Sequence, residues 1–386
     1  MSETEGSWFR TLCLISALLQ AVYVAVRVLL SYRILELGEG GAAIGAVTAL
    51  YSLAPLLIAI PLGRLVDGRY LSLVLRTGIL LSLAAVLVVA VGESLQAIAL
   101  GSIVLGVGNL LTAVGSQTYI PRRTTDAMMD RRFGSLSLWV SLGQACGLPV
   151  AGVVASSSLG TSGALHVMAA AAASALALSC SRGLTTTYVE SRNALGRAVR
   201  RDSTRSLIAN TGMRAAILSS LMVLTAIDLM GAYLPVLGAQ KGWTVLTVTT
   251  ILTARSVASI ASRALLPVLL ATVARRHLLL SGTAASVAPV ALLPLAWHPS
   301  VAVLLLSVAG FFWGIAQPLT MTWVTSLAAP ASRGAALSLR MTGNRLGQVL
   351  IPACAGALTA ITGTGAVFVT TSVMLAIAAM STWKNA

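Results

Sequence analysis

Long apolar runs, separated by short polar or charged segments, recur along the whole chain. Each run is close to the roughly 20 residues that an α-helix needs to cross the hydrocarbon core of a bilayer. The pattern therefore predicts twelve membrane-spanning helices. Their expected ranges are 12–35, 42–62, 71–91, 95–116, 136–156, 164–180, 215–237, 245–266, 278–296, 301–327, 337–361 and 366–380.

One polar stretch is much longer than the others and lies near the middle of the chain. It covers 181–214 and contains seven arginines. It separates six predicted helices in 1–180 from six more in 215–386, so we expect two six-helix bundles. The stretch itself is expected to be a basic cytoplasmic loop.

A weak internal repeat relates the two halves. A shift of 201 residues places Tyr32 on Tyr233 and Gly41 on Gly242, among other matches. Membrane transporters are often built from such repeats. The sequence thus predicts an all-α integral membrane fold, in which two pseudo-symmetric six-helix bundles surround a central cavity.

The composition excludes the main alternatives to a membrane protein. The chain is 57% hydrophobic and 10% charged, with a mean hydropathy of +0.89. A soluble domain averages about 45–50% apolar and about 25% charged residues, and a disordered chain is more polar still. The 386 residues allow about 32 for each span and its loop, so we expect twelve spans and almost nothing else.

The net charge of +15 is a signal of orientation. Of the 26 basic residues, 22 fall on the side of the two termini and the middle loop, and two, Arg33 and Lys241, fall on the other side. Arg340 and Arg345 belong to the 22, at the start of the eleventh run. The positive-inside rule then places both termini in the cytoplasm of a multi-pass cell-membrane protein. The expected partners of these charges are anionic lipids of the inner leaflet, and not nucleic acid.

The loop after the second run carries the most specific motif. Residues 63–70 read Gly-Arg-Leu-Val-Asp-Gly-Arg-Tyr. This loop resembles the one between helices 2 and 3 of the major facilitator superfamily of secondary transporters, Gly-x-Leu-Ala-Asp-Arg-x-Gly-Arg. Gly63, Leu65 and Asp67 match in place, whereas Gly68-Arg69 is shifted. The resemblance implies alternating access and a gating latch at the cytoplasmic face formed by Gly63, Asp67 and Arg69; the alternative is a solvated turn.

Two further features bear on the resemblance. Antiporters of that superfamily carry an arginine in helix 4, four residues before Gly-x-Gly, but here Ser102 precedes the Gly-Val-Gly at 106–108. This departure argues against their usual route of proton-coupled export. The fifth run contains Gly143, Gly147 and Pro149, which are compatible with either close helix packing or a hinge.

Three charged residues are assigned to the interior of spans and not to either side of the membrane: Arg27, Asp228 and Arg255. Each costs roughly 2.5–3.5 kcal/mol at a helix centre, so such residues usually face a cavity or a partner. Arg27 and Asp228 are 201 residues apart. We therefore predict a charge pair across the central cavity, acting as an external gate or as a static bridge.

Arg255 is then expected to bind a negatively charged group of the substrate, with snorkelling to the cytoplasmic interface as the alternative. Other polar side chains within the spans complete the expected cavity. They are Asn109, Gln144, Gln317, Asn344 and Arg345.

These features predict a secondary active transporter that moves a small organic solute by alternating access. A proton on Asp228 is the expected coupling ion, and efflux of a drug-like or anionic metabolite is the favoured direction. Uptake of an organic anion is the alternative; a membrane-embedded enzyme or a non-transporting sensor are the alternatives of a different class. The sequence has no nucleotide-binding Gly-x4-Gly-Lys-Ser/Thr loop and no metal-ligand spacing. We expect a monomer with no enzymatic activity, catalytic residues, cofactor or metal.

Overall fold

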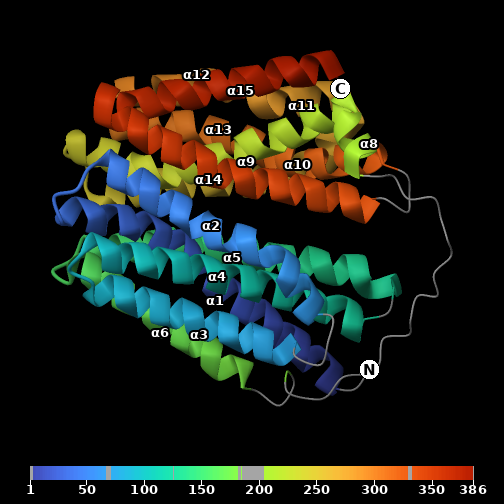
Figure 1. Cartoon of the computed structure of the whole chain (residues 1–386), viewed down its shortest axis with the longest axis horizontal. Coiled ribbons are helices and arrows are strands. Elements are labelled where there is room, and N and C mark those ends of the chain that lie inside the picture. Colours follow the sequence, from blue (N-terminus) through green and yellow to red (C-terminus); the bar gives the residue numbers. More distant parts are fainter. Residues whose placement is uncertain are drawn as a thin grey trace. The chain divides into compact units, whose positions relative to one another are not determined.

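The computed structural model describes residues 3–66, 71–124, 126–180, 184, 204–328 and 333–385. Every regular element within them is a helix (Figure 1). In the first half these are α1 (Glu3–Glu36), α2 (Gly41–Val66), α3 (Leu71–Val91), α4 (Leu95–Arg123), α5 (Asp126–Ala155) and α6 (Gly160–Ser179). In the second half they are α8 (Thr204–Ala209), α9 (Thr211–Gln240), α10 (Val245–Thr272), α11 (Arg275–Ala284), α12 (Val287–Leu292), the 3₁₀ turn η1 (Leu293–Leu295), α13 (Pro299–Ser326), α14 (Arg333–Thr362) and α15 (Gly365–Asn385).

Among the described residues, twelve helical segments are long and apolar enough to cross a membrane, which confirms the expected number. The third span, Leu71–Val91, has the expected ends. The first and seventh spans, Ser7–Glu36 and Thr211–Gln240, are longer than expected. The chain is therefore an all-α, multi-pass membrane protein.

The ninth span differs from the single helix expected over 278–296. It consists of α11, α12 and η1, with Ala285 and Ser286 between the two α-helices. Pro289 has no N–H group, and its ring conflicts with the carbonyl group four residues earlier, that of Ala285. Pro294 lies within η1, where the tighter 3₁₀ geometry replaces the α-helix.

The chain divides into two compact units. The first contains Met1–Glu39 and Leu50–Leu195, and the second contains Gly40–Ala49 and Gly196–Ala386. The start of α2 therefore packs as part of the second unit. There the hydroxyl of Tyr233 on α9 donates a hydrogen bond to the carbonyl of Gly41 at 2.9 Å. Most of the predicted basic loop, 181–214, lies outside the described residues, apart from α8 and the start of α9.

In the first unit α1 packs on α5 and α6, and α3 packs on α4 and α6. Gly143 and Gly147 of α5 face the backbone of Ala17 and Ala21 of α1. Glycines four residues apart allow two helix backbones to approach closely. The glycine-rich part of the fifth span therefore serves close packing.

The second unit repeats this contact. Gly343 and Gly347 of α14 lie against Ile217 and Leu221 of α9, and each number exceeds its counterpart in the first unit by 200. The internal repeat is thus visible in the packing of the helices.

Other helices follow an offset of 204. Gly106 of α4 lies against the backbone carbonyl of Tyr51 on α2, and Gly310 of α13 lies against that of Arg255 on α10. Arg255 thus occupies the position that Tyr51 holds in the first unit.

The single shift of 201 expected from the sequence is therefore wrong. The glycine that corresponds to Gly242 is Gly38 and not Gly41, because both adopt positive φ, 69° and 78°, in the loops after α9 and α1. The two offsets, 200 and 204, differ by four residues, which is about one helical turn. Between Leu221 and its C-terminal end, α9 therefore has about one more turn than the matching part of α1, which leaves the faces of the two helices nearly aligned.

The corrected register also separates the two intramembrane charges. Arg27 corresponds to Ile227 at an offset of 200 and to Gly231 at 204, and in neither case to Asp228. Consecutive helical residues point about 100° apart. The repeat therefore gives no support to equivalent positions for Arg27 and Asp228.

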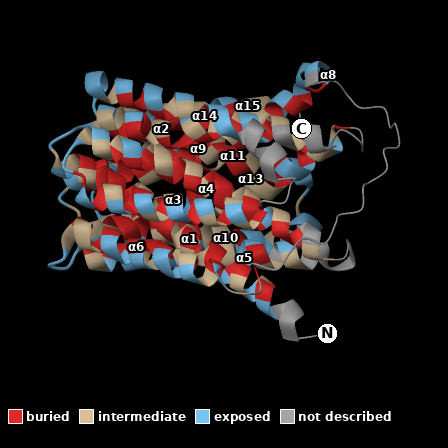
Figure 2. Ribbon diagram, turned by 60° about the horizontal axis from the view of Figure 1, so that its bottom comes forward, coloured by how far each residue is buried: buried red, intermediate tan, exposed pale blue. Residues whose placement is uncertain are grey.

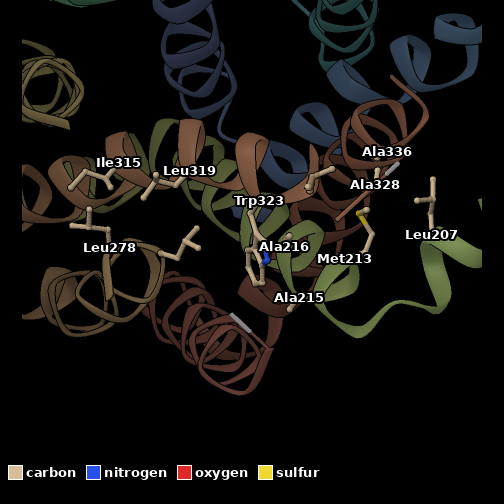
Figure 3. Packing of buried hydrophobic residues seen from close by; sticks show 12 residues of the cluster. Leu207, Met213, Ala215, Ala216, Leu278, Ile315, Leu319, Trp323, Ala328 and Ala336 are labelled. Atoms are coloured by element: carbon tan, nitrogen blue, oxygen red, sulfur yellow. The ribbon is translucent and has the colours of Figure 1, made fainter. Parts of the chain in front are cut away.

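Buried and exposed residues alternate along single helices such as α3 (Figure 2). Large apolar side chains remain exposed on many of them, including Leu73 on α3 and Leu304 on α13. In a spanning helix such side chains face lipid. In the second unit, Trp323 and Leu319 of α13 pack with Met213 of α9 and Leu278 of α11 in one buried cluster (Figure 3).

Candidate functional site

In the first unit, Arg27 of α1, Tyr51 of α2 and Asn109 of α4 are in contact. The Arg27 guanidinium lies over the Tyr51 ring, 4.9 Å from its centroid. The Tyr51 hydroxyl accepts a hydrogen bond of 2.6 Å from Asn109 Nδ2. The quadrupole of the ring attracts the cation, so Tyr51 links two of the predicted site residues.

A buried group of hydroxyls joins α1, α3 and α4 of the same unit. The Tyr23 hydroxyl is hydrogen-bonded to Ser82 Oγ at 2.7 Å and to Thr112 Oγ1 at 2.9 Å. Each of these hydroxyls both donates and accepts, so the group is satisfied without any charge.

A cavity of about 100 Å³ lies among α1, α3, α4 and α5 of the first unit. Half of its twelve lining residues are neutral hydrogen-bonding side chains, namely Ser16, Gln20, Tyr23, Thr112, Ser116 and Gln117. Gln20 accepts a hydrogen bond from Gln144 Nε2 at 3.1 Å, which places the predicted residue Gln144 next to this lining. The cavity suits a hydroxyl- or amide-bearing group.

In the second unit the polar contacts involve charge. Asp228 on α9 is 5% exposed, and its Oδ2 accepts a hydrogen bond of 2.6 Å from Gln348 Nε2 on α14. Gln348 Oε1 accepts a hydrogen bond of 3.2 Å from Arg345 Nη1. The amide thus connects two of the predicted site residues, a carboxylate and a guanidinium.

One face of α14 continues this polar group. Arg340, Asn344 and Gln348 lie at four-residue steps, and their exposed fractions are 5%, 7% and 5%. Arg340 Nη2 donates to Thr320 Oγ1 of α13 at 3.3 Å. Arg340 Nε and Asn344 Oδ1 have no hydrogen-bond partner among the described residues, and Arg340 forms no ion pair with any of them.

This burial corrects the assignment of Arg340 to the loop charges that only set orientation. Its guanidinium lies inside the second unit. An arginine removed from water without a counter-ion is costly. Its burial therefore makes Arg340 a candidate site residue that its place in the sequence did not suggest.

Arg255 and Gln317 lie elsewhere in the same unit. Arg255 is half-buried on α10, and its Nη2 donates to Ser256 Oγ at 3.1 Å. Gln317 is half-buried on α13, and its backbone carbonyl accepts a hydrogen bond from Thr320 at 3.0 Å. Thr320 also contacts Arg340, so Gln317 lies one turn from the α14 polar face.

A sequence model of the Major Facilitator Superfamily matches residues 12–331 and 216–384. The chain belongs to this superfamily. No curated protein sequence matches it.

Solved structures of superfamily transporters have the same fold. The nucleoside transporter NupG has a TM-score of 0.79 and 16% identity, over 98% of each chain. A bacterial homologue of the human lysosomal transporter Spinster has a TM-score of 0.77 and 15% identity, over 100% of this chain and 97% of its own. A D-xylose–proton symporter has a TM-score of 0.77 and 14% identity, over 97% of each chain.

The superfamily's latch motif falls at an edge of the described chain. Gly63 lies near the end of α2, whereas Asp67 and Arg69 lie outside the described residues. The latch stays a prediction. So does the Arg27–Asp228 pair, since the two residues belong to different units.

The structure adds residues that the sequence analysis did not select. Gln348 is four residues after Asn344, so helical spacing could have placed it on the same face. Gln20 is a polar residue inside the first span, a comparable signal. Tyr51 gave no such signal, because a tyrosine in a membrane helix is ordinary and its partners come from two other helices.

Proposed function

We propose that this superfamily member is a secondary active, proton-coupled transporter of a small organic anion, working by alternating access. The observation that supports it most is the excess of buried positive charge in the second unit. Arg340 is 5% exposed and has no ion-pair partner among the described residues, and Arg345 lies five residues further along α14. A carboxylate or phosphate on the solute compensates such guanidinium groups, because it matches their paired donors.

Asp228 is the group proposed to take the proton. It is the only acidic residue in the sequence from 204 to 386. A carboxylate buried in a span is a common proton carrier in transporters. The D-xylose–proton symporter among the similar structures shows that this fold accommodates proton coupling, although it says nothing of the solute carried here.

A neutral, hydroxyl-rich solute is the second candidate. The first-unit cavity supports it, because its polar lining is made of uncharged amides and hydroxyls. A nucleoside transporter and a xylose symporter share the fold of this chain, and the solutes in their names carry hydroxyl groups.

Flux into proteoliposomes tests the two candidates. Labelled benzoate, succinate, uridine and xylose are offered to vesicles that are more acidic outside than inside, with and without a protonophore. Benzoic acid crosses a bilayer unaided and accumulates in an alkaline interior, so only accumulation above that of protein-free vesicles is counted. We expect succinate to accumulate above that background and the protonophore to abolish the excess. Accumulation of uridine or xylose alone contradicts the anion proposal, and binding without flux supports the sensor alternative.

A further inference from the structure

The orientation of Gln348 is fixed by the chemistry of its neighbours. An ionised carboxylate only accepts hydrogen bonds, and a guanidinium only donates them. Gln348 lies between one of each, so its Nε2 faces Asp228 and its Oε1 faces Arg345, at 2.6 Å and 3.2 Å. The three side chains therefore form a directed chain within the second unit.

The helices packed on α9 carry several cations and no acidic residue. The helices packed on α9 are α8, α10, α11, α13, α14 and α15. The titratable and charged residues of these helices and of α9 are Arg205, Arg214, Tyr233, Arg255, Arg263, Arg275, Arg276, His277, Arg333, Arg340, Arg345, Cys354 and Lys384, besides Asp228. None is a second acid, and the predicted first-unit partner, Arg27, is also a cation. The protonation of Asp228 therefore decides whether this region holds any negative charge.

We infer that a proton and a solute carboxylate bind together at the Asp228–Gln348–Arg345 chain. The inference rests on the proposed function and specifies how proton binding and solute binding are coupled. Within the three-residue chain, the charges of an ionised Asp228 and Arg345 cancel, while Arg340 adds the same positive charge whatever the state of Asp228. A proton on Asp228 removes the negative charge that would repel a solute carboxylate. Because Asp228 and Gln348 are buried and Arg345 is half-buried, the carboxylate is favoured more strongly when Asp228 is protonated.

Gln348 transmits the change between the two ends as a positioning residue. A hydrogen bond to an ionised carboxylate is about twice as strong as one to a neutral acid. Protonation of Asp228 therefore weakens its hydrogen bond to Gln348, and in turn the hydrogen bond between Gln348 and Arg345. The guanidinium then becomes available for two parallel N–H···O bonds to the solute.

This coupling determines the direction of transport. Linkage is reciprocal, so a proton that promotes anion binding is itself bound more tightly when the anion is present. The two then cross the membrane together. A proton gradient directed into the cell drives uptake of the anion, which favours the uptake alternative over the efflux expected from the sequence.

Proton uptake by the purified full-length protein tests the inference. Benzoate or succinate is added in weakly buffered detergent solution. A pH-indicator dye reports the protons taken up, and the rise in the thermal unfolding midpoint reports binding. We expect wild type, assayed over a series of pH values, to take up about one proton per bound anion at the pH of greatest uptake. Gln348→Leu, or Gln348→Met if that variant does not fold, should bind the anion with uptake reduced to near zero.

Two further variants separate coupling from structure. Asp228→Asn imitates the protonated form, so it should bind the anion without proton uptake. Gln240→Leu is the matched control, because it removes an amide of the second unit whose partner, Thr364, is uncharged; its proton uptake should equal that of wild type.

Each of the other outcomes contradicts a defined part of the proposal. Anion binding with proton release, or without proton exchange in wild type, overturns the coupling while leaving transport possible. Failure of both probes to raise the unfolding midpoint of wild type overturns the anion class. Normal proton uptake per anion without any flux into vesicles contradicts the proposed transport and leaves the coupling intact.

Discussion

Equivalent positions in the two units carry different chemistry. Tyr51 lies against Gly106 and accepts a hydrogen bond from Asn109, whereas its counterpart in the second unit, lying against Gly310, is Arg255. The polar network of the first unit around Tyr23 is neutral, and that of the second connects Asp228 to Arg345. The comparison shows that duplicated packing can be kept while the polar side chains diverge. Besides the Arg27 guanidinium, the first unit then offers neutral hydrogen-bonding groups, whereas the second offers a carboxylate and guanidinium groups connected by an amide.

The largest expected effect concerns the packing that the units share. A Cβ at Gly147 would meet the backbone of Ala21 at 2.5–2.8 Å, whereas a Cβ at Gly347 would meet only the flexible side chain of Leu221. Gly147→Ala should therefore destabilise the protein by about 2–3 kcal/mol, and Gly347→Ala by about 1 kcal/mol or less. Thermal unfolding in detergent measures both.

The matched control is Gly231→Ala on α9, where a Cβ would meet nothing within 4 Å. It should cause no loss of stability, because alanine is the better helix former. Equal losses for Gly147→Ala and Gly347→Ala would show that the two interfaces are equally tight.

The second prediction concerns the buried charge of the second unit. Arg340→Leu removes a buried cation that has no ion-pair partner among the described residues. Replacing an uncompensated buried charge by an apolar side chain is neutral or stabilising, so the unfolding midpoint should stay or rise. Binding of benzoate or succinate should weaken by about 10–100-fold, since a hydrogen bond to a charged group contributes about 1.5–3 kcal/mol.

Arg263→Leu is the control, because Arg263 is an exposed arginine on α10. It should leave anion binding unchanged. A large loss of stability in Arg340→Leu with normal anion binding would show that Arg340 has only a structural role.

The fold was largely predictable from the sequence. The length and apolarity of the runs determine the twelve spans, because a bilayer imposes a nearly constant helix length. The break in the ninth span was not predictable from its prolines. Pro149, Pro235, Pro267, Pro318 and Pro352 all lie within continuous helices here. Neighbouring helices and side chains decide which proline interrupts a span.

The site was predictable only in part. Residue type and position within a span identified Asp228 and Arg345, because charge in a bilayer is costly. Their connection through Gln348 depends on the rotation of α14 against α9, which no single-helix pattern determines. Arg340 was assigned to the loop charges because it lies in the first turns of the eleventh predicted span, 337–361. Its burial follows from the packing around α14, not from its depth in the membrane.

The smallest expected effect concerns the neutral side of the comparison. Tyr51→Phe keeps the ring over which Arg27 lies and removes only the hydroxyl that accepts from Asn109. We expect a loss of about 1 kcal/mol in stability, and about 0.5–1 kcal/mol more for Tyr51→Leu, which also removes the cation–π contact. Thermal unfolding in detergent measures both.

A double-mutant cycle of Tyr51→Phe with Asn109→Ala isolates the hydrogen bond from other effects. If the two side chains stabilise the unit through their contact, the double variant should lose less than the sum of the single variants, by at least about 0.5 kcal/mol. Exactly additive losses would mean that the 2.6 Å contact contributes nothing. Arg255 occupies the position of this tyrosine in the second unit. Additive losses would therefore also argue against a polar site at this position in both units.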